Sequence, residues 1–342
     1  MSPGWEELIA RVHGLSTHLL GRDRMLEAAR SKSLSHLLTL FEEARGASSG
    51  VGPGATPAQA ELAVRRAAAA YLVTLARWSP PQSRLLAPFF LDEDRRSVRT
   101  LARGAMAEVP EAERISGLVP TPALPERTLR ELASQRSVAE IAALLSAWNH
   151  PFGSRLLAFA RQPRPDLLRL DLLLNDAWIT GSAEAVRRSP RGFDTRRQIT
   201  GFVRDTADDT NAMTALQLAG QRTGIDPGEF FLPMGRHLGK ETFLAAARAP
   251  STTAAMVILE RAFRDTPLAR AFAGPSRDIE GRVLMARLRH AAREALQSPL
   301  GAAPVVAFVL RLRAEVRDLC LIIWRLAAGA APPSPGELLS VG

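Results

Sequence analysis

The chain has 342 residues, of which 46% are hydrophobic and 6% aromatic, and it carries a formal net charge of +9. Alanine, leucine and arginine dominate and are strong helix formers, whereas runs of β-branched residues are nearly absent. The composition therefore favours an all-α fold over a sheet-based one. No apolar run reaches the length of about 18 residues that a membrane-spanning helix needs, so we expect no direct membrane insertion.

The spacing of apolar residues predicts groups of small helices that alternate with long antiparallel helix pairs. The groups of small helices are expected at 5–45, 118–148 and 231–272. The long helices are expected at 58–78, 91–106, 165–188, 194–221, 277–297 and 302–328. The segment 46–57 is rich in glycine and proline and is interpreted as a flexible connector, because it lacks the Gly-Lys-Ser/Thr of a phosphate-binding loop.

The three groups of small helices are copies of one sequence pattern. They align without gaps from Leu20, Leu124 and Leu238, with apolar positions at the spacing of a buried helical stripe. The aligned residues include the serines Ser33, Ser137 and Ser251 and the apolar residues Leu37, Ile141 and Ala255. We predict that each serine caps its helix and that the apolar residues are buried. The chain is therefore expected to contain three homologous modules, at about 1–110, 111–222 and 223–342.

A second pattern recurs once in each module, as an acidic residue followed three positions later by a small polar one. The pairs are Asp94 and Ser97, Asp208 and Asn211, and Glu315 and Asp318. We place them at helix starts, where the helix dipole favours anions, and the spacing puts both side chains on one helix face. They are interpreted as structural residues that cap the helix and bond to another helix of the same module. The alternative is a polar ring that lines a central hollow.

The sequence offers little for catalysis. The six histidines are scattered without a metal-ligand spacing such as His-Glu-x-x-His, and Cys320 lies in an apolar helix, where it is interpreted as a core residue. The adjacent carboxylates at 92–94 and 208–209 are assigned to the stabilisation of helix starts rather than to acid–base catalysis. We predict no catalytic residue, no cofactor and no metal site.

Basic residues are numerous, and all except Lys32 and Lys240 are arginine. This bias fits a genome-wide coding preference, and the arginines are interleaved with acids, so no nucleic acid partner is predicted. The densest group consists of Arg187, Arg188, Arg191, Arg196 and Arg197. It lies at the turn between two long helices, opposed only by Asp194, and is either a solvated turn or a partner contact.

The predicted helix 277–297 carries two stripes of different character. The apolar stripe consists of Met285, Leu288, Ala292 and Leu296 and is expected to face the core. The basic stripe consists of Arg282, Arg289 and Arg293. We interpret the basic stripe as a solvated face, with a binding surface as the alternative.

These features resemble the C subunits of the V/A-type rotary ATPases, whose eukaryotic counterparts are called d subunits. The resemblance rests on the three polar pairs, on the serine-headed small helices, and on the connectors Leu118-Val-Pro120 and Phe231-Leu-Pro233. The segment Ala10–Leu20 is also similar to that family's opening helix, and Thr266-Pro267-Leu268 is similar to its Thr-Pro-Tyr corner. The similarity covers nearly the whole chain.

The resemblance implies a funnel of three similar helical modules around a pseudo-threefold axis. It also implies a non-catalytic role in a central rotor that is coupled to proton or sodium transport. Such a protein caps the membrane proteolipid c-ring, receives the D and F subunits of the central stalk, and transmits torque between ring and stalk. Its expected location is cytoplasmic, peripheral on the inner face of the membrane through the complex.

The residues alone also permit two interpretations outside that family. The first is a helical-repeat scaffold that binds another protein or RNA, for which a salt-sensitive shift with nucleic acid would favour the RNA version. The second is a helical enzyme, which requires a cluster of polar residues in a pocket.

Overall fold

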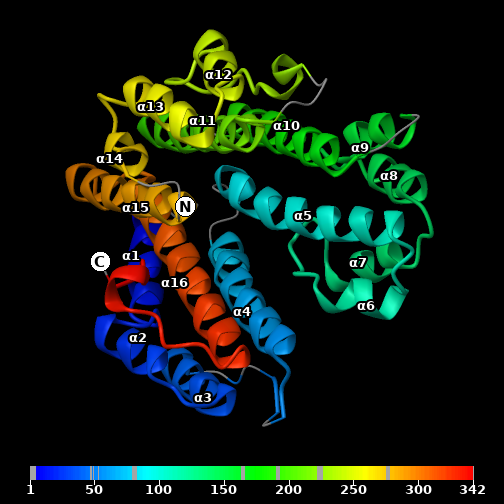
Figure 1. Cartoon of the computed structure of the whole chain (residues 1–342). Coiled ribbons are helices and arrows are strands. Elements are labelled where there is room, and N and C mark those ends of the chain that lie inside the picture. The colour runs from blue at the N-terminus through cyan, green and yellow to red at the C-terminus, as the bar shows by residue number, and fades with distance from the viewer. Residues whose placement is uncertain are drawn as a thin grey trace. The chain divides into compact units, whose positions relative to one another are not determined.

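All regular structure in the described residues of the computed structural model is helical (Figure 1). The description covers residues 5–46, 48, 50–52, 54–78, 83–162, 166–189, 193–221, 226–274 and 278–341. Within these ranges the chain forms sixteen α-helices and no strand, so the predicted all-α class is confirmed.

The helices alternate between short and long, as the apolar spacing predicts. The long helices are α4 (Pro57–Trp78), α5 (Ser83–Met106), α10 (Leu167–Arg187), α11 (Phe193–Leu218), α15 (Ile279–Gln297) and α16 (Ala303–Ala327). The short α-helices are α1 (Trp5–Ser16), α2 (Arg22–Ala29), α3 (Leu34–Arg45), α6 (Glu111–Ser116), α7 (Glu126–Ala133), α8 (Val138–Ala147), α9 (Gly153–Ala160), α12 (Lys240–Ala247), α13 (Thr252–Ala262) and α14 (Ala269–Phe272). Two 3₁₀ turns, η2 (Pro227–Phe230) and η3 (Pro335–Glu337), complete the described elements.

The repeated serines are helix caps. The Oγ atoms of Ser33, Ser137 and Ser251 each accept the backbone N–H three residues later, at 3.2 Å in all three copies. The second copy is a full capping box, because the Glu140 carboxylate also accepts the Ser137 N–H at 3.0 Å. The residues that follow at the aligned apolar position, Leu37, Ile141 and Ala255, are all buried. Both predictions for the small helices are confirmed.

The main departure from the predicted elements is the start of α5, which begins at Ser83 instead of residue 91 and contains Pro88. Pro88 has no backbone N–H to donate, so the helix lacks one backbone hydrogen bond near its start. The carbonyl of Pro88 accepts the indole N–H of Trp178 on α10 at 2.9 Å, and the Trp178 side chain is buried. Helices α6 and α9 are also present without having been predicted.

The chain divides into two compact units. The first comprises Met1–Pro190 and Arg311–Gly342, and one of its cores forms where α16 lies alongside α4 (Figure 1). Leu319, Ile322 and Ile323 of α16 are buried there against side chains of α3 and α4, as the run of apolar residues predicts. Burying each such side chain contributes about 1.5–3 kcal/mol, so this contact makes a large contribution to the stability of the first unit.

The second unit comprises Arg191–Leu310, which includes α11 to α15. Helix α11 packs on α12 and α13, and the rings of Phe263 and Phe272 stack with centroids 5.1 Å apart. The predicted apolar stripe of α15 is only partly correct, because Leu288 is buried whereas Leu296 is 83% exposed. The buried face of α15 instead includes Arg287, whose charge is neutralised by two aspartates of α11. The module boundaries predicted near residues 110 and 222 stay a prediction.

None of the helices in the described ranges is both long enough and apolar enough to cross a lipid bilayer.

Candidate functional site

The three polar pairs lie in the middle of long helices, not at helix starts. Helix α5 begins well before Asp94, α11 well before Asp208, and α16 well before Glu315. The placement at helix starts was therefore wrong, because the apolar run that follows each acid is the second half of a longer helix. All six side chains of the three pairs are buried. A buried carboxylate needs hydrogen-bond donors, and the structure supplies them from the backbone.

The pair on α11 shows the arrangement most clearly. Asp208 accepts three consecutive backbone N–H groups, those of Arg236, His237 and Leu238, each at 3.0 Å. Asn211 binds both backbone groups of Leu232, accepting its N–H at 2.9 Å and donating to its carbonyl at 2.8 Å. Gly235 is required beside the acid, because a Cβ at that position would lie 2.1 Å from the Asp208 Oδ1 atom.

The pair on α5 makes the same connection with one side chain inserted. Asp94 accepts the Thr121 hydroxyl at 2.5 Å, and that hydroxyl accepts the Leu124 N–H at 3.0 Å. The second oxygen of Asp94 lies 3.3 Å from Nε2 of His150. Ser97 contacts both backbone groups of Val119 at 3.4 Å, as Asn211 does with Leu232. The acid is thus linked to the start of the following small helices.

The pair on α16 repeats the pattern with residues from both ends of the chain. Glu315 accepts the Leu20 N–H at 2.6 Å and also pairs with the Arg45 guanidinium. Asp318 accepts the N–H groups of Leu339 and Ser340 at 3.0 and 2.8 Å. Because Asp318 cannot donate where Asn211 does, it binds two N–H groups instead of one N–H and one carbonyl.

We call each of these arrangements a junction, and the three junctions share one order along the chain. In each, the acid is linked to the start of a group of small helices, directly at Leu238 or Leu20 and through the Thr121 hydroxyl at Leu124. The second residue of each pair binds the backbone of a connector segment, at Val119 for Ser97, Leu232 for Asn211 and Leu339 for Asp318. The bonds predicted within a module therefore join one predicted module to the next, and the last acid returns to the first group of small helices.

The connector at Leu338-Leu339-Ser340 and Arg45 were not predicted from the sequence as parts of these junctions. Leu338-Leu339-Ser340 is the third copy of the connector, hidden because serine stands where the other two copies have proline. The signal that could have found it is the distance along the chain from the polar residue to the connector residue that it binds. That distance is 22 residues in the first copy and 21 in the other two. Arg45 gives no comparable signal, because it lies 270 residues from Glu315.

Burial and nearby positive charge shift the pKa of the acids of α5 and α16 in opposite directions. Burial raises the pKa of Glu315, although Arg45 and the Leu20 N–H oppose that shift. The Arg45 guanidinium also lies over the rings of Phe41 and Tyr71, 4.7 and 4.5 Å from their centroids. These contacts make the Glu315 junction a closed, buried assembly.

Asp92, two residues before Asp94, behaves differently from Glu315. Burial alone would raise its pKa, but the guanidiniums of Arg313, Arg95 and Arg96 hold the pKa well below its usual range. Arg313 of α16 reaches Asp92 at 2.7 Å, so this ion pair ties α16 to α5. Each carboxylate described here is engaged by several donors, which is an arrangement for holding elements together rather than for transferring protons.

One group of described residues has the spacing of a metal site. The ligand atoms of Asp205, Asp208 and His237 lie within 4.8 Å of one another. Both Asp208 oxygens already accept backbone N–H groups, and Asp205 pairs with Arg236 at 2.7 Å and with Arg287 at 3.0 Å. Two guanidiniums beside the carboxylates oppose the binding of a cation, so the residues present do not fit a metal.

The predicted arginine group is exposed where the structure describes it. Arg187 and Arg188 at the end of α10 are 73% and 68% exposed, and both pair with Glu184, at 2.8 and 2.5 Å. Glu184 is thus a second acid that opposes this group, beside the predicted Asp194. Arg197 on α11 is 71% exposed and lies 3.7 Å from Asp194, and Arg196 is half-buried. Arg191 lies outside the described residues.

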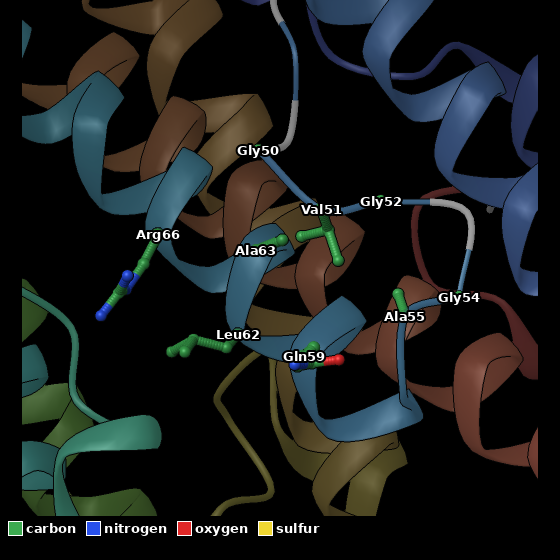
Figure 2. A pocket seen from close by; sticks show the side chains of 9 residues that line it. All are labelled: Gly50, Val51, Gly52, Gly54, Ala55, Gln59, Leu62, Ala63 and Arg66. Carbon is green, nitrogen blue, oxygen red and sulfur yellow. The ribbon is translucent and has the colours of Figure 1, made fainter. Parts of the chain in front are cut away.

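Two shallow hollows lie in the first unit. One, of about 410 Å³, is formed by residues of the glycine-rich segment 46–57, from Gly50 to Ala55, and by Gln59, Leu62 and Arg66 of α4 (Figure 2). Its charged lining residue, Arg66, donates to the Leu118 carbonyl at 3.4 Å. The other hollow, of about 380 Å³, lies between α4 and α5 and is lined by ion pairs such as Arg65 with Glu61. The charged side chains that line the second hollow are engaged in ion pairs, as Arg96 is with Asp92 and Arg99 with Asp171, so neither hollow stands out as a ligand site among the described residues.

Cys320 of α16 is half-buried, so its interpretation as a core residue is only partly correct. Burial raises the pKa of its thiol to about 11, so the thiol stays protonated at neutral pH. A protonated thiol is a poor nucleophile and a poor metal ligand.

Comparison with known proteins adds one finding to this geometry. The chain matches the family model described as the ATP synthase (C/AC39) subunit, and the match covers residues 8–333. A search of curated proteins returned no match. The matched range contains the three serine-capped helices and all three acids of the junctions. The chain therefore belongs to the C/AC39 subunit family of V/A-type ATP synthases, and its partners are other subunits of that membrane-associated complex.

Proposed function

We propose that this protein is the non-catalytic adaptor of the rotor, joining the D and F subunits of the central stalk to the membrane proteolipid c-ring. The observation that carries the proposal is the family match over residues 8–333. In this role it transmits torque between the ring and the stalk, coupled to proton or sodium transport, at the cytoplasmic face of the membrane. Its three modules, at about 1–110, 111–222 and 223–342, surround a pseudo-threefold axis.

The junctions support a role in carrying mechanical load. A rotor part that transmits torque has to keep its shape while its two ends are pulled in opposite directions. Each junction fixes a long helix to another segment through a buried carboxylate, which binds backbone N–H groups directly at Asp208 and Glu315 and the Thr121 hydroxyl at Asp94. Hydrogen bonds to a charged acceptor are stronger than neutral ones, contributing about 1.5–3 kcal/mol each.

We propose the arginine group Arg187, Arg188, Arg191, Arg196 and Arg197 as a contact with another subunit. Three of these side chains are more than two-thirds exposed, and the neighbouring acids Glu184 and Asp194 are fewer than the arginines. An exposed ion pair contributes only about 0–1 kcal/mol and is weakened by salt, so the contact depends on several pairs acting together.

The adaptor role is tested on membranes that carry the assembled complex. When the gene for this protein is deleted, we expect the c-ring to stay in the membrane while the stalk and the catalytic head appear in the soluble fraction. The measurement is the distribution of head, stalk and ring proteins after sedimentation. A head that stays on the membrane without this protein would contradict the adaptor role.

The arginine contact has its own test. Changing the five arginines to glutamate should release the stalk and head at lower salt than in the wild-type complex. The matched control reverses five exposed arginines elsewhere, which gives the same change in net charge. The control residues are Arg24, Arg30, Arg127, Arg136 and Arg264. If both variants release the head at the same salt concentration, the contact site is wrong and the adaptor role survives.

A further inference from the structure

The most exposed large apolar side chains in the described part of the chain lie together at the end of α15. Leu296 is 83% exposed and Leu300 is 67% exposed, and Leu300 follows in the turn that leads to α16. A single exposed leucine is common on a protein surface, but neighbouring ones indicate a surface that another molecule covers. An exposed leucine forfeits the free energy that its burial would contribute.

The turn that carries Leu300 is fixed in place. Gln198 of α11 donates from Nε2 to the Ser298 hydroxyl at 2.9 Å and accepts the Ala303 N–H at 3.0 Å. Gly301 lies directly against that amide, since a Cβ there would lie 2.5 Å from the Gln198 Oε1 atom. A fixed turn loses little conformational freedom when a partner binds, so the leucines are preorganised for contact.

Two arginines continue the same exposed face of α15. Arg289, Arg293 and Leu296 occupy positions i, i+4 and i+7, which lie on one side of a helix. Arg289 and Arg293 are exposed, and within the described ranges neither forms an ion pair with a carboxylate. Arg287, on the buried face, pairs with Asp205 and Asp209. The exposed face therefore combines uncompensated positive charge with apolar surface.

We propose that Arg289, Arg293, Leu296 and Leu300, which we call the α15 strip, form a docking surface for an acidic amphipathic helix of another rotary ATPase subunit. The strip supplies what such a helix needs, because its leucines match an apolar stripe and its guanidiniums match flanking carboxylates. A second copy of this chain is a poorer occupant, since a symmetric contact places the same arginines against each other. This inference rests on the proposed role of the chain as an adaptor that contacts both stalk and ring.

The test compares variants of the strip in membranes that carry the assembled complex. Leu296→Ser with Leu300→Ser should weaken retention of the contacted subunits about tenfold or more at every salt concentration, because apolar contacts are not screened. Arg289→Glu with Arg293→Glu should weaken retention most at low salt, because charge contacts are screened at high salt. Thermal unfolding of each isolated variant, matching that of the wild type, shows that the fold is intact.

Matched controls separate the strip from general surface effects. Val257→Ser changes an apolar side chain that is 45% exposed on α13, and Arg24→Glu with Arg127→Glu makes the same charge change in the other compact unit. Both controls should behave as the wild type. If the strip variants also behave as the wild type although deletion of the whole protein releases the head, the α15 strip is wrong and the adaptor role stands. If deletion releases nothing, the adaptor role itself fails.

A photoreactive benzophenone amino acid in place of Leu296 identifies the occupant in the purified complex. We expect a crosslink to an acidic helical segment of another subunit and none from the same group placed at Val257. A crosslink to a second copy of this chain would overturn the proposal. So would binding of the isolated chain to vesicles of anionic lipid that the two serine substitutions abolish, because the strip would then be a membrane contact.

Discussion

At the scale of single residues, the charge of Glu315 is balanced inside the protein. Its two oxygens are bound by the Leu20 N–H and by Arg45, whose guanidinium lies over the rings of Phe41 and Tyr71. Neither partner of this ion pair can reach water when the other is removed. The stability effect of a substitution is therefore dominated by the charge that is left behind, not by the bond that is lost.

Glu315→Ala should lower the free energy of unfolding by about 3–5 kcal/mol, because Arg45 stays buried without its carboxylate and the Leu20 N–H loses its acceptor. The control is Glu126→Ala, which breaks the exposed pair with Arg130 and should cost about 1 kcal/mol or less. Urea unfolding of both variants measures the difference. Equal shifts would mean that the Glu315 junction is open to water in solution.

Asp92→Asn should have a cost that depends on pH. The guanidiniums around Asp92 hold its folded-state pKa below the unfolded value of about 3.9, so its contribution is present above that value and is lost as pH falls below it. We expect Asp92→Asn to cost about 3 kcal/mol at pH 6 and progressively less between pH 4 and pH 2. Denaturant unfolding across this range measures the convergence. A cost that stays constant from pH 6 to pH 2 would show that the ion pairs contribute nothing.

At the scale of elements, α16 connects more segments than any simple helix pair requires. Its C-terminal half packs in the core with α3 and α4, and its Asp318 holds the segment that follows η3. Leu338, Leu339 and Val341 of that segment are buried, although the family match ends at residue 333. The last residues of the chain are therefore a structural element of the first unit and not a tail.

Deleting residues 334–342 should lower the free energy of unfolding by about 4 kcal/mol or more, because three buried apolar side chains are lost and Asp318 loses its donors. Ser340→Ala removes only the hydroxyl that donates to Asp318 at 2.7 Å and should cost about 1 kcal/mol. Chemical denaturation of the two variants gives the comparison. If the truncated chain is as stable as Ser340→Ala, the burial of this segment does not contribute in solution.

Much of the element order could be predicted from the sequence because helical periodicity is a local signal. The serine caps and the long helices were found in this way. The start of α5 was missed because Pro88 suggests a boundary, and the hydrogen bond that the Pro88 carbonyl accepts comes from Trp178, which is distant in the sequence.

The junctions were only half predictable. The acidic and polar residues repeat, so comparison of the copies found them, but what they bind is backbone, which has no sequence signature. Their placement at helix starts failed because a buried acid in mid-helix and an acid in a first turn look alike in sequence. Arg287 was missed for a similar reason, since its pairing with Asp205 and Asp209 joins two helices that are far apart in the chain.

At the scale of the whole molecule, the order of the junctions matters more than any single one. The acids on α5 and α11 are linked to the group of small helices that follows each helix. Glu315 on α16, near the end of the chain, holds Leu20 near its beginning. Arg22 adds a second link between the ends by donating to the Val341 carbonyl at 2.9 Å. The connectors at 118–120 and 231–233 each lead into the group of small helices that follows them. The connector at Leu338-Leu339-Ser340 has the corresponding place before the first group of small helices, although the two lie at opposite ends of the sequence.

A circularly permuted chain tests this order. The new chain begins at Pro332, passes through residue 342 and a ten-residue Gly/Ser linker to residue 1, and ends at Ala331, in a stretch that is exposed. The linker has to reach from the C-terminal segment past α1 to residue 1. It can extend to about 33 Å, whereas α1 is only about 18 Å long. We expect the permuted chain to unfold within about 1 kcal/mol of the wild type, because the same contacts form. If the permuted chain fails to fold while the wild type with the linker appended folds, the assignment of residues 338–340 as the connector of the first small helices is contradicted.

At Leu20 and Leu238 the junctions need only a backbone N–H group from the small helices. The acids at 94, 208 and 315 have to be kept, but the groups that Asp208 and Glu315 receive are peptide N–H groups, which every residue except proline provides. Random substitution at Leu20 or Leu238 can therefore alter the side chain without removing the donor, as long as the apolar contact is replaced. We therefore expect selection to constrain the identity of the acids at 94, 208 and 315 more strongly than the identity of the side chains at Leu20 and Leu238.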